Sequence, residues 1–240
     1  MGSRTPKVRG ARGEPDLESL LLAILHDDRV SARKLIATDS RLSTALVDHA
    51  RLFDSDIVHW LYLNDTALHL AAAGHRVAIV QMLLAAGADP NSCRNHRRSG
   101  PLHYAADGFQ SPSFDPAEQV KTISCLLNAG ADLQAADKNG ATALHRAVRT
   151  RSAEAVECLL LAGADPTVKN LPGATPFHLA VQNTGRGGTG DPVAKAAQRR
   201  IIESMLGHKV KATMKDARGK SVLDWATSDW VRQLLSGRRE

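Results

Sequence analysis

Residues 137–169 read DKNGATALHRAVRTRSAEAVECLLLAGADPTVK, and parts of this stretch recur along the 240-residue chain. The string TALHRA at 142–147 returns as TALHLA at 66–71, GPLHYA at 100–105 and TPFHLA at 175–180. The string LLLAGADPT at 159–167 returns as LLAAGADPN at 83–91 and LLNAGADLQ at 126–134. Two degenerate copies, SLLLAI at 19–24 and SVLDWA at 221–226, flank the set. The chain is therefore a tandem repeat with a period near 33 residues.

Each repeat predicts two short helices. Thr142 precedes an apolar run and is a favourable N-cap residue, and Leu144, Ala147 and Val148 then fall at helical spacing. A second helix follows, and Gly163 suits the left-handed residue that ends many helices. Two short helices cannot bury a narrow apolar face alone, so neighbouring units must stack as a solenoid.

The pattern T-P-L-H-x-A-A followed by L-L-x-x-G-A-D resembles the ankyrin repeat. Residues 137–169 match this pattern nearly residue for residue, 66–91 match almost as well, and weaker copies extend it over 16–235. The resemblance implies an all-α ankyrin-repeat solenoid of about six helix–loop–helix units with hairpin-like fingers. It also implies that the finger tips and the first helices line a concave face.

We expect a disordered basic tail over 1–15, a single ankyrin-repeat domain over 16–236 and a short tail over 237–240. The units are expected at about 16–43, 61–93, 95–136, 137–169, 170–215 and 216–236. Insertions are expected at about 44–60, 108–118 and 184–198. The run ALVDHARLF at 45–53 is amphipathic and predicts an extra helical turn or two.

The two later insertions fall between the helices of the third and fifth units, so they leave the same edge of the solenoid. We expect a notch between them, floored by Arg149 and Arg151. Gly207 and Lys209 stand near the place of the usual Gly-Ala-Asp in the fifth unit, which predicts a second helix about two residues short. Trp225 and Trp230 are expected to cover the last unit's open end.

Ten histidines and three cysteines invite a search for chemistry. Four histidines, His69, His103, His145 and His178, occupy the same place in their units, and the resemblance gives them a structural role near the fingers. The other six show no metal-ligand spacing, and Cys125 and Cys158 are expected to be packing residues. The glycine-rich stretch 185–190 favours a flexible insertion over a phosphate loop, because no strand precedes it. No catalytic residue, metal or cofactor is expected.

Composition bounds the remaining function classes. The longest apolar stretch, residues 20–25, is too short to cross a bilayer, and no secretory signal precedes it, so we expect no membrane partner. Three cysteines favour a reducing, cytoplasmic location. The net charge of +6 is compatible with an acidic partner, whereas aromatic residues are only 4% of the chain, which weakens single-stranded nucleic acid as a ligand. We expect a monomer.

We expect a non-catalytic scaffold that presents its concave surface to a protein partner, through an acidic or polar segment of that partner. The residues expected to bind this partner are His96, Arg97, Asp107, Lys138, Asn139, Arg149, Arg151, Gln182, Asn183 and Arg218. Two alternatives stay open. One is a nucleic acid or other polyanion bound by the basic fingers and tail, and the other is a small enzyme whose pocket the inter-helix insertions form.

Overall fold

The computed structural model describes residues 16–53, 55, 57, 59–108, 114–183 and 192–237. The expected tail over 1–15, most of the C-terminal tail and residues 109–113 and 184–191 of the two inter-helix insertions lie outside the described residues. The notch that these insertions were expected to flank therefore stays a prediction.

Helices in pairs build the described part of the chain, as the sequence repeat predicts. The pairs are α1 (Leu17–Leu25) and α2 (Arg29–Thr38), α3 (Ala67–Ala73) and α4 (Val77–Ala85), α5 (Pro101–Ala106) and α6 (Pro116–Asn128), α7 (Ala143–Arg149) and α8 (Ala153–Leu161), α9 (Pro176–Ala180) and α10 (Pro192–Gly207), and α11 (Val222–Trp225) and α12 (Asp229–Ser236). A short 3-10 helix, η1 (Ser40–Ser43), follows α2. The all-α solenoid predicted from the repeat is confirmed.

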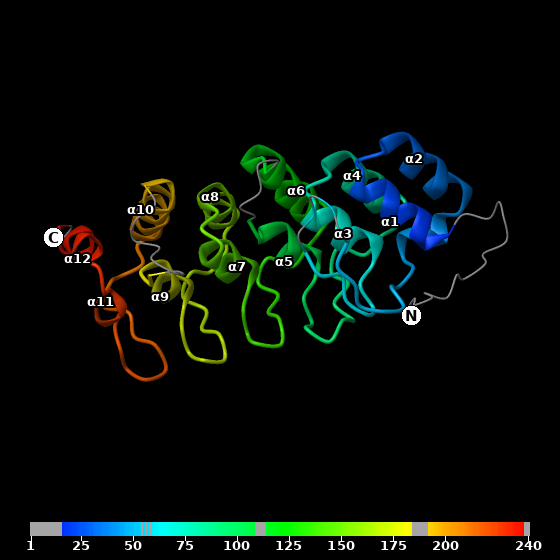
Figure 1. Ribbon diagram of the computed structural model, residues 1–240. Helices are drawn as coiled ribbons and strands as arrows, with labels where there is room; N and C mark the ends of the chain where they lie inside the picture. The colour runs from blue at the N-terminus through cyan, green and yellow to red at the C-terminus, as the bar shows by residue number, and fades with distance from the viewer. Residues whose placement is uncertain are drawn as a thin grey trace, which may run out of the picture.

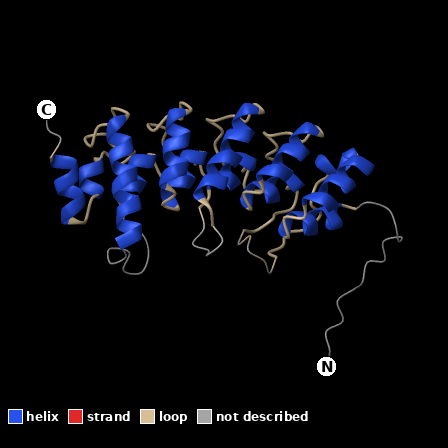
Figure 2. Ribbon diagram, turned by 90° about the horizontal axis from the view of Figure 1, so that it is seen from above, coloured by secondary structure: helices blue, strands red, loops and turns tan. Residues whose placement is uncertain are grey.

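The pairs stack side by side in one elongated array (Figures 1 and 2). The odd-numbered helices form the inner row and the even-numbered helices the outer row, and the fingers between pairs project from the side of the inner row (Figure 1). One continuous apolar core runs between the rows from Leu20 to Leu235, and Cys125 and Cys158 pack against it as expected. Within the described residues, no helix is long and apolar enough to cross a bilayer.

The four equivalent histidines join neighbouring units. Each follows its N-cap residue by three positions, and its Nδ1 atom accepts the N-cap backbone N–H at 3.0 to 3.3 Å. Because Nδ1 accepts, the ring proton is on Nε2. The Nε2 atoms of His69, His103, His145 and His178 donate to the carbonyl oxygens of Ser99, Ala141, Ala174 and Lys220 at 3.0 to 3.2 Å. The predicted structural role near the fingers is confirmed.

The third and fifth units share a capping arrangement at the end of their short inner helices. The carbonyl oxygen of Ala105 accepts from Gln119 Nε2 at 2.9 Å and from His75 Nε2 at 3.1 Å. The carbonyl oxygen of Ala180 likewise accepts from Gln198 Nε2 at 2.8 Å and from Arg151 Nη1 at 3.0 Å. These side chains satisfy carbonyl groups that a longer helix would have bonded internally.

The amphipathic run over 45–53 does not form the predicted helical turns. It pairs instead with the chain ahead of α3, through antiparallel bridges between Leu46 and Thr66 and between Arg51 and Leu61. The backbone N–H groups of Arg51 and Leu61 donate to each other's carbonyls at 2.8 and 2.9 Å. The prediction was wrong because pairing with residues 10 to 20 positions away overrode the local pattern.

The inter-helix insertions also contain more helix than expected. Residues 116–118 and 192–198 begin the outer helices α6 and α10, which have 13 and 16 residues against 9 in α4 and α8. Asp115 accepts the N–H of Ala117 at the N-cap of α6, and a proline opens each of the two helices. A proline is well tolerated in this first position.

The second helix of the fifth unit keeps its full register, contrary to the predicted early end. Val210 N–H donates to Met205 O at 3.2 Å, the same closing bond that Ala164 makes to Leu159 at 2.9 Å. Lys209 takes the place of Gly163 and adopts its left-handed backbone, with φ of 61° against 94°. A lysine can therefore end this helix where the sequence lacks the expected glycine.

The last unit covers the end of the core with its tryptophans partly buried, as expected. Trp225 Nε1 donates to Asp216 at 3.0 Å, and its ring meets the edge of His178 at 5.3 Å. Lys195 and Arg199 of α10 lie over the ring of Trp230 at 5.3 and 5.5 Å.

Gly173 and Gly163 offer a matched test of finger stacking. Both have φ near 90°, but a Cβ on Gly173 would overlap Ala217 of the next finger, whereas a Cβ on Gly163 would meet open space. Gly163→Ala should cost only the left-handed strain of about 1–2 kcal/mol. Gly173→Ala should cost about 1–3 kcal/mol more, since overpacking adds to the strain. Urea unfolding of both variants measures the difference, and equal losses would contradict this stacking.

The buried histidines should make the fold sensitive to mild acid. Burial lowers the pKa of His75 and of His103 from 6.5 to about 4. The folded state thus favours the neutral rings, so the stability they contribute is complete above pH 6.5 and is lost as the pH falls toward 4. Between pH 7 and 5 the free energy of unfolding should fall by about 2 kcal/mol for each ring. Urea titrations at several pH values should show that the free energy of unfolding falls less between pH 7 and 5 for His103→Gln than for the wild type. A wild type whose free energy of unfolding does not change with pH would refute this.

Candidate functional site

The fingers turn on an aspartate or asparagine side chain. Asp137 Oδ1 accepts the backbone N–H groups of Asn139 and Ala141 at 2.8 and 3.0 Å. Asp216 Oδ1 does the same for Arg218 and Lys220, at 2.8 Å each. Each side-chain oxygen bonds two backbone N–H groups of its own turn, and these bonds hold the tip in a fixed shape.

Backbone hydrogen bonds also join one finger tip to the next. Lys138 N–H donates to Arg97 O at 2.8 Å, Leu171 N–H donates to Asn139 O at 2.8 Å, and Ala217 N–H donates to Gly173 O at 3.1 Å. The tips therefore form one continuous surface. We call the segments 94–98, 138–139, 169–172 and 215–220 the finger row.

The finger row separates its charges, with bases outside and acids inside. Its exposed ionisable side chains other than histidine are all basic: Arg94, Arg98, Lys138, Lys169, Lys215, Arg218 and Lys220. Its one acidic residue, Asp216, is buried and bonded to the turn and to Trp225. The surface that the tips present is accordingly positive along four successive fingers.

A buried ion network lies behind the middle of the row. Arg146 occupies a position of α7 that other units fill with Leu70, Tyr104 or Leu179, and it is 4% exposed. Its guanidinium donates to Asp107 at 2.9 Å, to Asp137 at 3.0 Å and to Ser99 Oγ at 2.9 Å.

Asp107 stays ionised within this network. Burial raises the pKa of its carboxyl, but the hydrogen bond from His59 and the charges of Arg146 and Arg149 outweigh burial and hold the pKa below its usual range. His59 Nε2 lies 3.3 Å and Arg149 Nη2 lies 3.7 Å from the carboxylate. An acid held in this way organises the side chains around it and stabilises the folded state.

The insertion between the first two units crosses the inner helices. Arg51 pairs with Glu18 in the first turn of α1, and Ile57 packs on Gly74 at the end of α3, where the glycine leaves room. His59 reaches Asp107 at the end of α5 and packs on Tyr104 at 4.3 Å. We call the described residues within 51–62 the strap. All residues of α3 and α5 are buried.

The strap ends in an aromatic cluster beside the first finger of the row. Trp60 is 50% exposed and stacks on Tyr62, with ring centroids 6.5 Å apart and planes at 23°. The Tyr62 ring meets His96 edge-on at 4.8 Å. Arg97 lies over the same ring at 5.4 Å and donates from Nη1 to the Tyr62 hydroxyl at 2.8 Å. We call Trp60, Tyr62, His96 and Arg97 the aromatic corner.

The structure places most of the residues expected to bind a partner at the surface. The exposed ones are His96, Lys138, Asn139, Arg149, Asn183 and Arg218. Arg97 and Gln182 are partly buried. Asp107 is 6% exposed, so the expectation that it faces a partner directly is corrected, because Arg146, Arg149 and His59 surround its carboxylate.

Arg151 also has a different environment from the expected notch floor. Its guanidinium donates to the carbonyl oxygens of Ala180 at 3.0 Å and Gln182 at 2.5 Å, so it caps α9 in the neighbouring unit. Burial lowers the pKa of Arg151 to about 10, and the group is still charged at neutral pH. Asn183 accepts from Ser228 at 2.7 Å, which ties it to the last unit.

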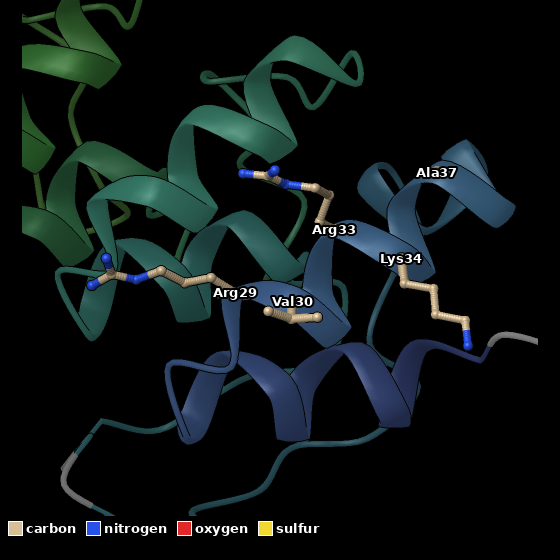
Figure 3. Close-up of a pocket in the computed structure, with 5 residues that line it drawn as sticks. All are labelled: Arg29, Val30, Arg33, Lys34 and Ala37. Carbon is tan, nitrogen blue, oxygen red and sulfur yellow. The ribbon is translucent and has the colours of Figure 1, made fainter.

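The described residues hold no cluster of three histidine, cysteine or acidic side chains that could bind a metal ion. Cys93, Cys125 and Cys158 are free thiols. A hollow of about 400 Å³ lies along α2 and is lined by Arg29, Val30, Arg33, Lys34 and Ala37 (Figure 3). All five belong to one outer helix, so this hollow is not a pocket between the inter-helix insertions.

Sequence reasoning missed His59, Trp60 and Tyr62. All three belong to or follow the insertion at 44–60, which the repeat pattern does not describe. The sequence does contain a signal for this cluster. Trp60 and Tyr62 stand two positions apart, just before the first clear repeat, in a chain with few aromatic residues. Two residues of one extended segment at this spacing share a face.

Comparisons with known proteins agree with this architecture. A family model described as "Ankyrin repeats (3 copies)" matches residues 93–170 and 117–189, and the model "Ankyrin repeat" matches residues 63–95. The ankyrin repeat and SOCS box protein 6 of Mus musculus is 39% identical over 83 residues, and that of Homo sapiens is 37% identical over 83 residues. Each alignment covers 35% of this chain and 18% of the relative.

A solved structure extends the likeness over the whole repeat array. The ankyrin repeat domain from Acinetobacter baumannii AYE superposes with a TM-score of 0.65, covering 92% of this chain and 95% of that one at 23% sequence identity. At this identity the likeness shows the fold alone. The repeated strings, the stacked helix pairs and the family models together show that the chain belongs to the ankyrin-repeat proteins.

Proposed function

We propose that this chain is a non-catalytic scaffold that binds an acidic segment of a protein partner along its finger row. Ankyrin repeats generally mediate interactions between proteins, and the chain belongs to that family. The observation that carries the partner's chemistry is the separation of charge in the row, where bases are exposed and the acid is buried.

The row is suited to carboxylates in shape as well as in charge. Asx turns and tip-to-tip backbone bonds already order the fingers, so binding costs little conformational entropy there. Arginine guanidinium groups can bind carboxylates through two parallel hydrogen bonds, and lysines add charge without this geometry. We assign the contacts to His96, Arg97, Lys138, Asn139, Arg149 and Arg218.

Several observations favour a scaffold over an enzyme. The described hollow is lined by basic and aliphatic side chains of one helix, without a nucleophile beside a base. The buried Arg146 is held in ion pairs with Asp107 and Asp137 at 2.9 and 3.0 Å. The three free thiols support a reducing compartment as the place where the scaffold acts.

Charge reversal on the tips should remove the partner. The Arg98→Glu/Lys138→Glu variant changes two exposed bases of adjacent fingers, and the control Arg33→Glu/Lys34→Glu makes the same change on α2. Nuclease-treated lysate passed over each immobilised protein should yield partners that the wild type and the control retain and the finger variant loses. Quantitative mass spectrometry measures the difference, and we expect at least a tenfold loss, equal to about 1.4 kcal/mol.

Two outcomes would overturn the proposal. Identical capture by the finger variant and the wild type would show that the row does not contact the partner. Partners captured from untreated lysate but not from nuclease-treated lysate, together with a gel shift of labelled nucleic acid whose affinity falls steeply with salt, would favour the polyanion alternative.

A further inference from the structure

We infer that the aromatic corner is the anchor of this surface, and that it takes a large apolar side chain flanked by the partner's carboxylates. The inference rests on the proposed function and adds to it a specificity site. Trp60 and Tyr62 lie outside the recurring helix and finger strings, so the two large rings of this site come from the end of the insertion and the residues after it, and the finger adds His96 and Arg97.

Trp60 offers the face of a large aromatic ring system to solvent. Its side chain is half exposed although it stacks on Tyr62, so the two rings form a stepped platform with one open face. Exposed tryptophan beside ordered polar groups is typical of the residues that dominate binding energy in protein interfaces. A flat or branched apolar side chain can cover this face and displace its water.

Arg97 is ordered before any partner arrives. Its guanidinium bonds the Tyr62 hydroxyl and lies over that ring, while its backbone carbonyl accepts from Lys138. These contacts restrict the rotamers of a side chain that would otherwise lose much entropy on binding. Arg97 Nε is buried, so the terminal N–H groups that do not bond Tyr62 are the ones that can meet a carboxylate next to the apolar side chain.

The strap fixes the platform in place. His59 Nδ1 lies 2.8 Å from the Trp60 carbonyl oxygen, and its Nε2 lies 3.3 Å from Asp107, which in turn bonds Arg146. Trp60 therefore takes its position from a network that joins the insertion to the third and fourth units. Such support from buried neighbours is what a rigid binding site requires.

Charge selects the kind of segment that docks here. Arg94 and Arg98 flank the corner in the same finger, Lys138 stands on the next, and the finger row exposes no acidic side chain. A basic or neutral apolar peptide would leave these cations unpaired at the contact. An acidic extended segment with one large apolar residue matches both parts of the surface.

The test is selection from a random 12-residue peptide library displayed on phage. Selections use the full chain as wild type, as Trp60→Ala, as Trp60→Phe, as Arg98→Glu/Lys138→Glu, and as Leu161→Ala, a control that truncates another exposed apolar residue far along the chain. Melting temperatures of all proteins establish that each variant is folded. The consensus peptide is then titrated, labelled with fluorescein, against every variant at two salt concentrations.

The inference predicts acidic peptides with one fixed position for Leu, Ile, Phe or Trp. Peptides selected on Trp60→Ala should stay acidic but have no fixed apolar position. The consensus peptide should bind this variant about tenfold more weakly than it binds the wild type. Trp60→Phe should recover most of the loss, and Leu161→Ala should bind as the wild type does.

Failures of the two proposals are distinguishable. Acidic peptides without a fixed apolar position, or the same position selected by Trp60→Ala, would overturn the anchor and leave the basic row intact. Absence of acidic enrichment, or undiminished binding by Arg98→Glu/Lys138→Glu, would overturn the proposed function as well.

Discussion

The hydrogen bond from each repeated histidine to the next unit's carbonyl is the contact on which the architecture depends. One ring begins an inner helix through Nδ1 and holds the following finger through Nε2. The ring can do both only when it is neutral, and its burial favours the neutral form. One side chain thus links the helix start of its own unit to the finger of the next, and the turn and tip-to-tip bonds complete the ordered finger row.

The sequence predicts the parts of the fold that repeat, because those parts depend on contacts one period apart. The helix pairs, the histidine bonds and the tryptophan cap all follow from recurring or terminal patterns. The insertions do not, since nothing local distinguishes an amphipathic helix over 45–53 from an extended segment that makes isolated bridges to Leu61 and Thr66. Lys209 shows a similar limit, because the closing bond of a helix can tolerate a non-glycine residue that local preference disfavours.

The candidate site divides in the same way. Repeat position alone predicts that finger residues such as Lys138 and Arg218 are exposed, and they are. The repeat pattern predicts a surface position for Asp107, which the structure buries. The pattern does not reveal that Arg146, which stands where other units have an apolar or aromatic residue, pairs with this buried acid. Trp60 escaped notice because its position depends on the strap reaching from α1 to α5, a path that three distant contacts determine.

The strap also gives the elongated surface a direction. It lies against α1, α3 and α5, whereas Arg149 at the end of α7 is 56% exposed. A segment bound along the fingers would meet the strap toward the N-terminal units and the exposed Arg149 beyond the end of the strap. The two termini of a bound segment are therefore inequivalent, and a peptide of reversed sequence presents its side chains in the wrong order to this surface.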